Sequence, residues 1–150
     1  MFEPPDPNYE SRARASFALQ GALTSMGAEL VRVEPGATEI HLRFHAVVTQ
    51  QHGYVHGGAI TTIVDTACGF AAMSLAPAGA EVLTVEFKVN FVNPARGDLF
   101  IARGRVRKAG RTLIIYEGEV VARGPNGDTP VALMLATVML VRHPSPGAGG

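Results

Sequence analysis

The sequence predicts a single α+β domain in which an antiparallel sheet of five or six strands curls around one long apolar helix. Its length of 150 residues suits one domain, since folded domains most often have about 100–150 residues. A hydrophobic content of 47% with only 17% charged residues favours a buried core over disorder. Four strand-like segments follow the long helix in a row, which argues against alternating βαβ units.

Segments rich in proline and glycine mark both ends of this domain. Residues 1–8 and 143–150 predict loose tails, so we expect the folded domain over residues 9–142. The domain begins with a short N-terminal helix over residues 9–26, which is amphipathic and has its apolar positions at Phe17, Leu19, Leu23 and Met26.

A hairpin and the long helix follow. Strands are expected over residues 29–34 and 38–45, joined by a turn at Pro35-Gly36. The second strand alternates, so one face is expected to carry Thr38, Ile40, Leu42 and Phe44. The segment after His56-Gly57-Gly58 predicts a helix of about eighteen residues, which ends before Pro77 because proline cannot continue the hydrogen-bond ladder.

Four strands complete the predicted sheet, over residues 81–93, 99–108, 111–122 and 131–141. Since alternate residues of a strand share a face, the first of them is expected to bury Leu83, Val85, Phe87, Val89 and Phe91. A turn at Ala109-Gly110 joins the second strand to the third, and a loop over residues 123–130 precedes the last. The last strand is almost wholly apolar, which suits a central position in the sheet.

Charge and cysteine content argue against several classes of protein. Thirteen basic and thirteen acidic side chains give a formal net charge of zero, whereas binders of nucleic acid or anionic membranes carry an excess of positive charge. The single cysteine, Cys68, excludes an intrachain disulfide and a multi-cysteine zinc site, and no metal-binding motif is present. The sequence shows no secretory signal and no membrane-spanning segment, so we expect a cytoplasmic protein.

Asp65 is a candidate functional residue because it is the one acid inside the long apolar helix. Small and hydroxyl residues lie one helical turn from it, so a substrate or another backbone could approach this face; they are Thr61, Thr62, Cys68 and Gly69. A buried carboxylate needs a partner, a solvated cleft or a catalytic role. Two interpretations stay open: a structural acid bonded to threonine hydroxyls, and a functional acid.

The segment His56-Gly57-Gly58 is a second candidate. Glycines at the start of a helix leave backbone N–H groups uncovered, where the helix dipole adds positive charge and favours a developing oxyanion. The alternative is a tight turn that needs glycine. Gly57 and Asp65 are eight residues apart, about 12 Å along one helix, too far for both to contact one reacting carbonyl. Two antiparallel helices in a symmetric dimer would bring them together, so an enzymatic site would be shared between subunits.

A basic segment is the third candidate. Residues 103–111, RGRVRKAGR, hold five of the thirteen positive charges and no acid. Arginines at alternate positions share one face of a strand, and Lys108 and Arg111 flank the turn. Such a group suits phosphates, and coenzyme A fits a neutral chain better than nucleic acid does. The alternative is a charged strand edge that faces solvent.

Three segments of the chain resemble the hotdog-fold acyl-CoA thioesterases, most closely the PaaI-like (phenylacetic acid degradation) group. They are GYVHGGAITTIVDTACGFAA at residues 53–72, LTVEFKVNFVNPARGD at 83–98 and VRKAGRTLIIYEGEVV at 106–121. The likeness covers residues 28–142. It implies the hotdog fold, a homodimer that is often paired into a homotetramer, and hydrolysis of an acyl- or aryl-acyl-CoA to a carboxylate and coenzyme A.

The resemblance also implies roles for individual residues. Asp65 would be the nucleophile or general base, and Gly57 of the partner chain would donate its N–H to the thioester oxygen. Gln50 would orient the substrate or water, and Thr84 would assist. His56 and Gly58 complete the HGG motif. His56 would belong to the catalytic residues, and Gly58 would bind the substrate. Coenzyme A phosphates would bind Arg107, Lys108 and Arg111. No cofactor is implied, because coenzyme A is part of the substrate.

Two other functions stay open on the same fold. One is a hotdog dimer that binds or senses acyl-CoA without hydrolysing it. The other is a hydratase or dehydratase, which would need a histidine as acid or base beside the carboxylate, and only His52 and His56 lie near the start of the helix. The normal pKa of an aspartate near 4 keeps it ionised at pH 7, and a thiolate leaves readily, so acyl transfer needs no catalytic histidine.

Overall fold

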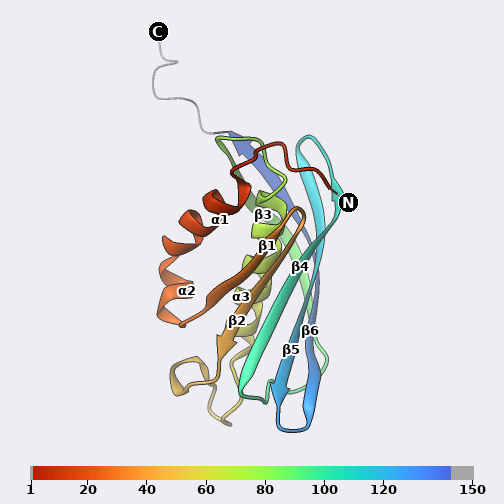
Figure 1. Cartoon of the computed structure of the whole chain (residues 1–150). Coiled ribbons are helices and arrows are strands. Elements are labelled where there is room, and N and C mark those ends of the chain that lie inside the picture. The colour runs from red at the N-terminus through yellow and green to blue at the C-terminus, as the bar shows by residue number, and fades with distance from the viewer. Residues whose placement is uncertain (1, 143–150) are drawn as a thin grey trace.

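Six strands form one antiparallel sheet that wraps around the long helix α3 in the computed structural model, which describes residues 2–142 (Figure 1). The order across the sheet is β1-β2-β4-β5-β6-β3, where the strands are β1 (Glu29–Glu34), β2 (Ala37–Arg43), β3 (Ala80–Phe91), β4 (Leu99–Ala109), β5 (Leu113–Gly124) and β6 (Gly127–Arg142). The helices are α1 (Tyr9–Ala18), α2 (Gly21–Ser25) and α3 (Gly57–Met73), with a 3₁₀ turn, η1, at Ala46–Val48. The predicted α+β fold is confirmed.

Helix α3 lies unusually close to the sheet because two glycines face it. A Cβ at Gly104 would come within 2.5 Å of the Ala67 backbone, and one at Gly118 within 2.6 Å of the Cys68 sulfur. The Cys68 thiol donates to the carbonyl of Glu117 at 3.4 Å and is fully buried. The expectation that Cys68 shares the open face of Asp65 is therefore wrong, because the sheet glycines admit it into the core.

The predicted N-terminal helix over residues 9–26 is in fact two helices. The N–H groups of Leu19 and Gln20 bond back to the carbonyls of Ser16 and Phe17, which closes α1, and α2 begins at Gly21. Leu19, expected on the apolar face, lies in this break and is 87% exposed.

Helix α1 is attached to the end of α3 by Arg12. Its guanidinium donates to the carbonyls of Met73, Ala76 and Pro77 at 2.7–3.0 Å and pairs with Asp6 at 3.3 Å. Asp6 lies in the segment that was expected to be a loose tail, residues 1–8, and is buried. The other expected tail, residues 143–150, lies outside the described residues.

Strand β3 contains a bulge between Thr84 and Glu86 that reverses its alternation. Residues directly opposite each other in an antiparallel pair share a face. Thr84 lies opposite the buried Val138, whereas Leu83 lies opposite Met139 on the outer face. The expectation that Leu83, Val85, Phe87, Val89 and Phe91 share one buried face is therefore wrong. All except Val89 are exposed, because β3 is the edge strand and has only β6 beside it.

The loop expected over residues 123–130 is also wrong. Strands β5 and β6 stay paired as far as Gly124 and Gly127, so only Pro125 and Asn126 form the turn. The Arg123 guanidinium bonds both oxygens of Asp128 at 2.8 and 2.9 Å across this hairpin. Among residues 2–142, no helix combines the length and apolar character that crossing a bilayer requires.

Candidate functional site

Two hydroxyl groups hold the carboxylate of Asp65. The Thr84 hydroxyl donates to Oδ1 at 3.1 Å, and the Tyr116 hydroxyl donates to the same oxygen at 3.3 Å. Thr84 reaches it because the bulge in β3 turns this residue inward, and Tyr116 reaches it from β5. Burial raises the pKa of Asp65, and the hydrogen bonds from Thr84 and Tyr116 offset only part of that rise.

A pocket of about 220 Å³ opens beside Asp65, between α1, α3 and β3. Ser16 of α1 and Gln20, which precedes α2, form part of its wall, and β3 contributes Glu81, Val82 and Thr84. Gly69, one turn after Asp65, also lines it, and a Cβ there would meet no atom within 4 Å. The carboxylate therefore faces a space that a small acyl group could enter.

The start of α3 carries one unpaired backbone donor. His56 is the N-cap, and its Nδ1 accepts the N–H of Gly58 at 2.8 Å. The Gly58 N–H is therefore already bonded within the chain. In contrast, the N–H of Gly57 has no hydrogen-bond acceptor among residues 2–142. Gly57 is the residue of the HGG motif whose N–H is free to bind an oxyanion.

A second pocket, of about 180 Å³, contains Gly57 and Gln50, together with Tyr54, Phe91 and Asn93. The Gln50 side-chain carbonyl accepts the backbone N–H of His52, which leaves its NH₂ group to donate. The Phe91 ring lies against Gly57, where a Cβ would come within 3.2 Å of it.

The structure brings Asp65 together with Thr84, and Gln50 with Gly57, but the two pockets share no residue. Strand β3 joins them, since Thr84 lines the first pocket and Phe91 the second. This separation agrees with the distance of about 12 Å that eight residues of helix impose. One chain therefore holds the Asp65 carboxylate and the unpaired Gly57 N–H in two different pockets.

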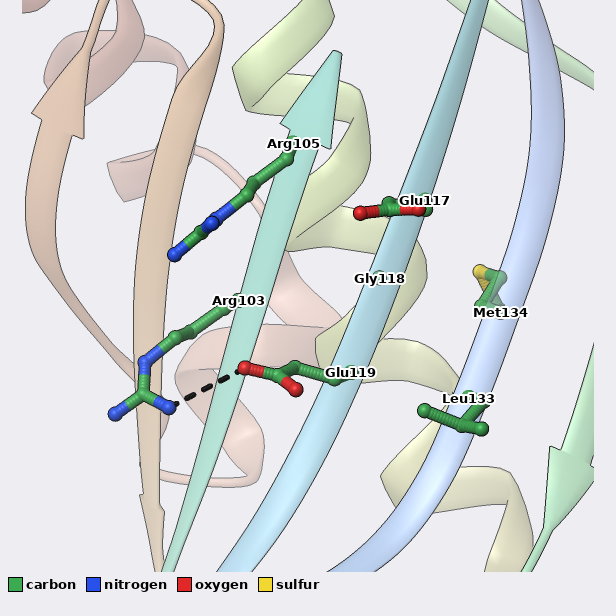
Figure 2. A pocket seen from close by; sticks show the side chains of 7 residues that line it. All are labelled: Arg103, Arg105, Glu117, Gly118, Glu119, Leu133 and Met134. Atoms are coloured by element: carbon green, nitrogen blue, oxygen red, sulfur yellow. Dashed lines mark hydrogen bonds and ion pairs between the residues drawn. The ribbon is translucent and has the colours of Figure 1, made fainter. Parts of the chain in front are cut away.

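The basic segment is paired with acids from neighbouring strands. Arg103 and Arg105 project from β4 over a groove of about 310 Å³, across from Glu117 and Glu119 of β5 (Figure 2). Arg103 contacts Glu119 at 3.4 Å, and Arg107 contacts Glu117 at 2.6 Å. Residues 103–111 contain no acid, but some of their positive charges are paired with acids of other strands. Lys108 and Arg111 are exposed.

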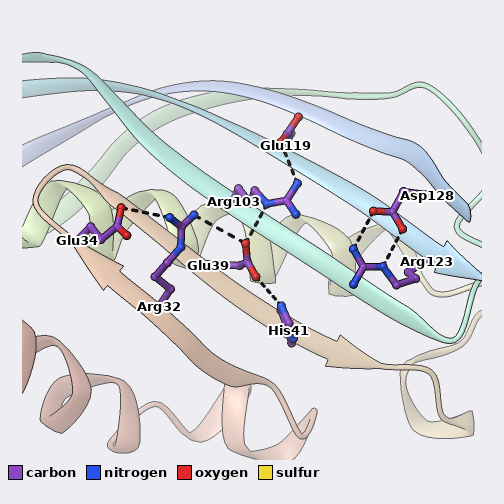
Figure 3. Close-up of polar contacts among 8 residues, drawn as sticks. All are labelled: Arg32, Glu34, Glu39, His41, Arg103, Glu119, Arg123 and Asp128. Atoms are coloured by element: carbon purple, nitrogen blue, oxygen red, sulfur yellow. Dashed lines mark hydrogen bonds and ion pairs between the residues drawn. The ribbon is translucent and has the colours of Figure 1, made fainter. Parts of the chain in front are cut away.

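Glu39 is the centre of a polar cluster on the same outer face (Figure 3). It accepts from Arg103 at 2.9 Å, contacts His41 at 2.7 Å and lies 3.8 Å from Arg32. Burial alone would raise the pKa of Glu39, but the hydrogen bonds from Arg103 and His41 outweigh it and lower the pKa. The cluster fixes the guanidinium of Arg103 to the sheet, so Arg103 is not available to a ligand as a free cation.

Sequence reasoning missed Tyr116, Ser16 and Gln20. The alternation of β5 could have indicated Tyr116, because Ile114, Tyr116 and Val120 are inward positions and only the tyrosine carries a polar group. No local sequence pattern indicates that Ser16 and Gln20 line the pocket of Asp65, because their position depends on the docking of α1 at Arg12. Across residues 2–142, no three His, Cys, Asp or Glu side chains cluster in a way that could hold a metal ion.

Known proteins similar to this chain are named esterases and thioesterases. The thioesterase superfamily matches residues 52–127. A curated relative from Halobacterium salinarum, named as an esterase, is 34% identical over 113 residues, which are 72% of this chain and 74% of that protein. The acyl-coenzyme A thioesterase PaaI of Escherichia coli is 24% identical over 110 residues, 73% of this chain and 76% of its own length.

Solved structures give the same result for the fold. A thioesterase family protein from Silicibacter pomeroyi superposes with a TM-score of 0.88 and 41% identity, over 90% of this chain and 99% of that chain. The E. coli PaaI protein superposes with a TM-score of 0.79 and 21% identity, over 89% of this chain and 94% of that chain, which bears on the fold alone. The predicted hotdog fold is confirmed.

Proposed function

The chain belongs to the thioesterase superfamily and is a thioester hydrolase, and we propose that it hydrolyses acyl- or aryl-acyl-coenzyme A at sites shared by two subunits. One observation carries this proposal: a carboxylate held by hydroxyls, Asp65, and an unpaired N–H, Gly57, lie in separate pockets joined by the edge strand β3. The name of the E. coli relative, an acyl-coenzyme A thioesterase, supports the substrate class.

The exposed edge of β3 supports a homodimer. Leu83, Val85, Phe87 and Phe91 of this strand are 43–58% exposed, although apolar side chains are stabilised by burial. Antiparallel pairing of β3 with its own copy would bring Thr84, near one end of the strand, towards Phe91 of the partner subunit, near the other end. The pocket of Asp65 then meets the pocket of the partner's Gly57, and the two-fold axis generates two such sites.

The outer face of the sheet supports the expected homotetramer. Exposed apolar residues form a row on β5 and β6, consisting of Leu113, Ile115, Leu133, Leu135 and Met139. A second dimer docked on this row would cover it. Groups of large exposed apolar side chains often mark a protein–protein contact.

Hydrolysis at the shared site would use the carboxylate as nucleophile or as general base. In the first case Asp65 attacks the thioester carbonyl, coenzyme A leaves as its thiolate, and water then hydrolyses the anhydride. In the second case Asp65 removes a proton from the water that attacks. The partner's Gly57 N–H stabilises the oxyanion in both, a contribution of about 3–4 kcal/mol for one such donor.

The other predicted residues have supporting roles in this proposal. Thr84 holds the carboxylate of Asp65, and His56 caps α3 and keeps Gly58 bonded, so that Gly57 remains the donor. The NH₂ group of Gln50 orients the substrate or the water. Lys108 and Arg111, with Arg107, bind the phosphates of coenzyme A. No cofactor or metal takes part in this scheme, and no nucleic acid or membrane partner is proposed.

The test is thiol release from a panel of acyl- and aryl-acyl-CoAs, followed colorimetrically. Asp65→Asn is expected to lower the rate at least about a hundredfold with the fold retained, because the amide cannot act as a nucleophile or base. Equal rates in both proteins would remove Asp65 from the mechanism. Coenzyme A binding without thiol release from any thioester would contradict hydrolysis and indicate a binding module.

Gly57 allows a matched pair of variants. Proline is tolerated at the first position of a helix and lacks an N–H, so Gly57→Pro removes the proposed donor and leaves α3 intact. Gly57→Ala introduces the same Cβ against Phe91 but keeps the N–H. We expect Gly57→Pro to lose about a hundredfold or more in kcat, and Gly57→Ala to lose much less. Similar losses in both variants would mean that steric contact with Phe91, and not the N–H, accounts for the effect.

A further inference from the structure

We propose that Tyr116 is a positioning residue for Asp65: with Thr84, its buried hydroxyl holds Oδ1 and leaves Oδ2 as the oxygen that reacts. This inference rests on the proposed function, in which Asp65 is the attacking group or the base. Tyr116 does not line either pocket of the site, so it would act through the carboxylate and not on the substrate.

Both donors contact one oxygen of the carboxylate. Thr84 donates to Oδ1 at 3.1 Å from the edge strand β3, and Tyr116 donates to Oδ1 at 3.3 Å from β5. A carboxylate oxygen accepts two hydrogen bonds readily, so Oδ1 is fully used. Since Asp65 lines the pocket, Oδ2 remains as the oxygen that can meet a thioester carbonyl or a water molecule.

The hydroxyl of Tyr116 has no packing role that a phenylalanine could not supply. The side chain is fully buried on the inward face of β5, in line with Ile114 and Val120, and its ring fills the core. A buried hydroxyl costs stability unless it is bonded, and Asp65 is the acceptor it has. Burial raises the pKa of Tyr116 above its usual value, so the hydroxyl keeps its proton and remains a donor at any working pH.

Within residues 2–142, no cationic side chain pairs with the carboxylate of Asp65. The groups around it are Thr84 and Glu81 on β3, Tyr116 on β5, Ser16 on α1, Gln20 before α2, and Cys68 on its own helix. Glu81 is itself an acid, and burial raises the pKa of the Cys68 thiol, so neither group supplies a positive charge. The hydrogen bonds from Thr84 and Tyr116 are therefore the interactions that favour the ionised carboxylate against burial.

The test compares Tyr116→Phe, which keeps the ring, with Tyr9→Phe, which removes a hydroxyl on α1. For Tyr116→Phe we expect kcat to fall about tenfold, since a hydrogen bond to a charged group is lost, while KM changes less than about twofold. The acid limb of the kcat/KM profile should move to higher pH. A ¹³C NMR titration of the Asp65 carboxyl should show the same upward shift in its pKa. Tyr9→Phe should match the wild type in all four measurements.

The Asp65→Asn background separates positioning from a structural effect. If Tyr116 acts through Asp65, adding Tyr116→Phe to Asp65→Asn should not lower the residual rate further. A tenfold loss in both backgrounds, or an unchanged Asp65 titration in Tyr116→Phe, would overturn the inference. Failure of the proposed function has a different result: Asp65→Asn keeps full activity, while the NMR titration still decides whether Tyr116 holds the carboxylate.

Discussion

Asp65 is placed where burial opposes the charge that the proposed reaction requires. Its pKa is raised in the folded protein by burial, against the hydrogen bonds from Thr84 and Tyr116. A carboxyl whose pKa is higher when folded than when unfolded stabilises the fold below its unfolded pKa. That contribution is lost as the pH rises through the folded value. At neutral pH the ionised Asp65 therefore lowers the stability of the protein.

This relation predicts that Asp65→Asn is more stable than the wild type at pH 7. The amide oxygen still accepts from Thr84 and Tyr116, and no charge is buried. Thermal melts should show a higher Tm for the variant at pH 7 and a smaller difference near pH 3, where the wild-type carboxyl is protonated. A variant less stable than the wild type at pH 7 would mean that the hydrogen bonds of the charged form outweigh its burial.

At this scale the sequence could predict the chemistry but not the contacts. Asp65 was visible because an acid is rare within an apolar helix, and the HGG motif located Gly57. The hydrogen bond from Tyr116 could not be predicted. It depends on β5 crossing α3 at one particular register, which the alternation of a single strand does not define.

The elements show where local pattern and tertiary structure differ. A strand was correctly predicted at β3, but its buried face was not. The bulge adds one residue, which reverses the alternation beyond it. The same bulge directs Thr84 to Asp65. Likewise, the apolar period of residues 9–26 suits one continuous helix, yet the helix is interrupted at Leu19. As a result, α1 docks on α3 and α2 buries Leu23.

Because Arg12 docks α1 on α3, we expect its replacement to lower the free energy of unfolding strongly. Replacement of the nearby Arg14 should have a small effect. Arg12→Ala leaves the carbonyls of Met73, Ala76 and Pro77 and the buried Asp6 without their partner, and should cost about 3 kcal/mol. Arg14→Ala removes an exposed pair with Glu10 and an exposed hydrogen bond to the carbonyl of Leu30, and should cost about 1 kcal/mol or less. Urea unfolding measures both. Equal losses would show that α1 is not held by Arg12.

At the scale of the whole molecule, a single folded chain exposes apolar side chains on two surfaces. The edge of β3 exposes apolar side chains that were predicted to be buried, and the outer face of β5 and β6 exposes another row. The fold class, the family and the central helix could all be predicted from the sequence. The proposed pairing of β3 with a second copy could not, because an edge strand that pairs with its own copy has the same apolar pattern as one buried within the chain.

The most direct measurement is complementation between two inactive variants. Asp65→Asn and Gly57→Pro are co-expressed in equal amounts, so that half of the dimers contain one chain of each. If the site combines Asp65 of one subunit with Gly57 of the other, each mixed dimer has one intact site, and thiol release should reach about a quarter of the wild-type rate. A mixture no more active than either variant alone would contradict a shared site.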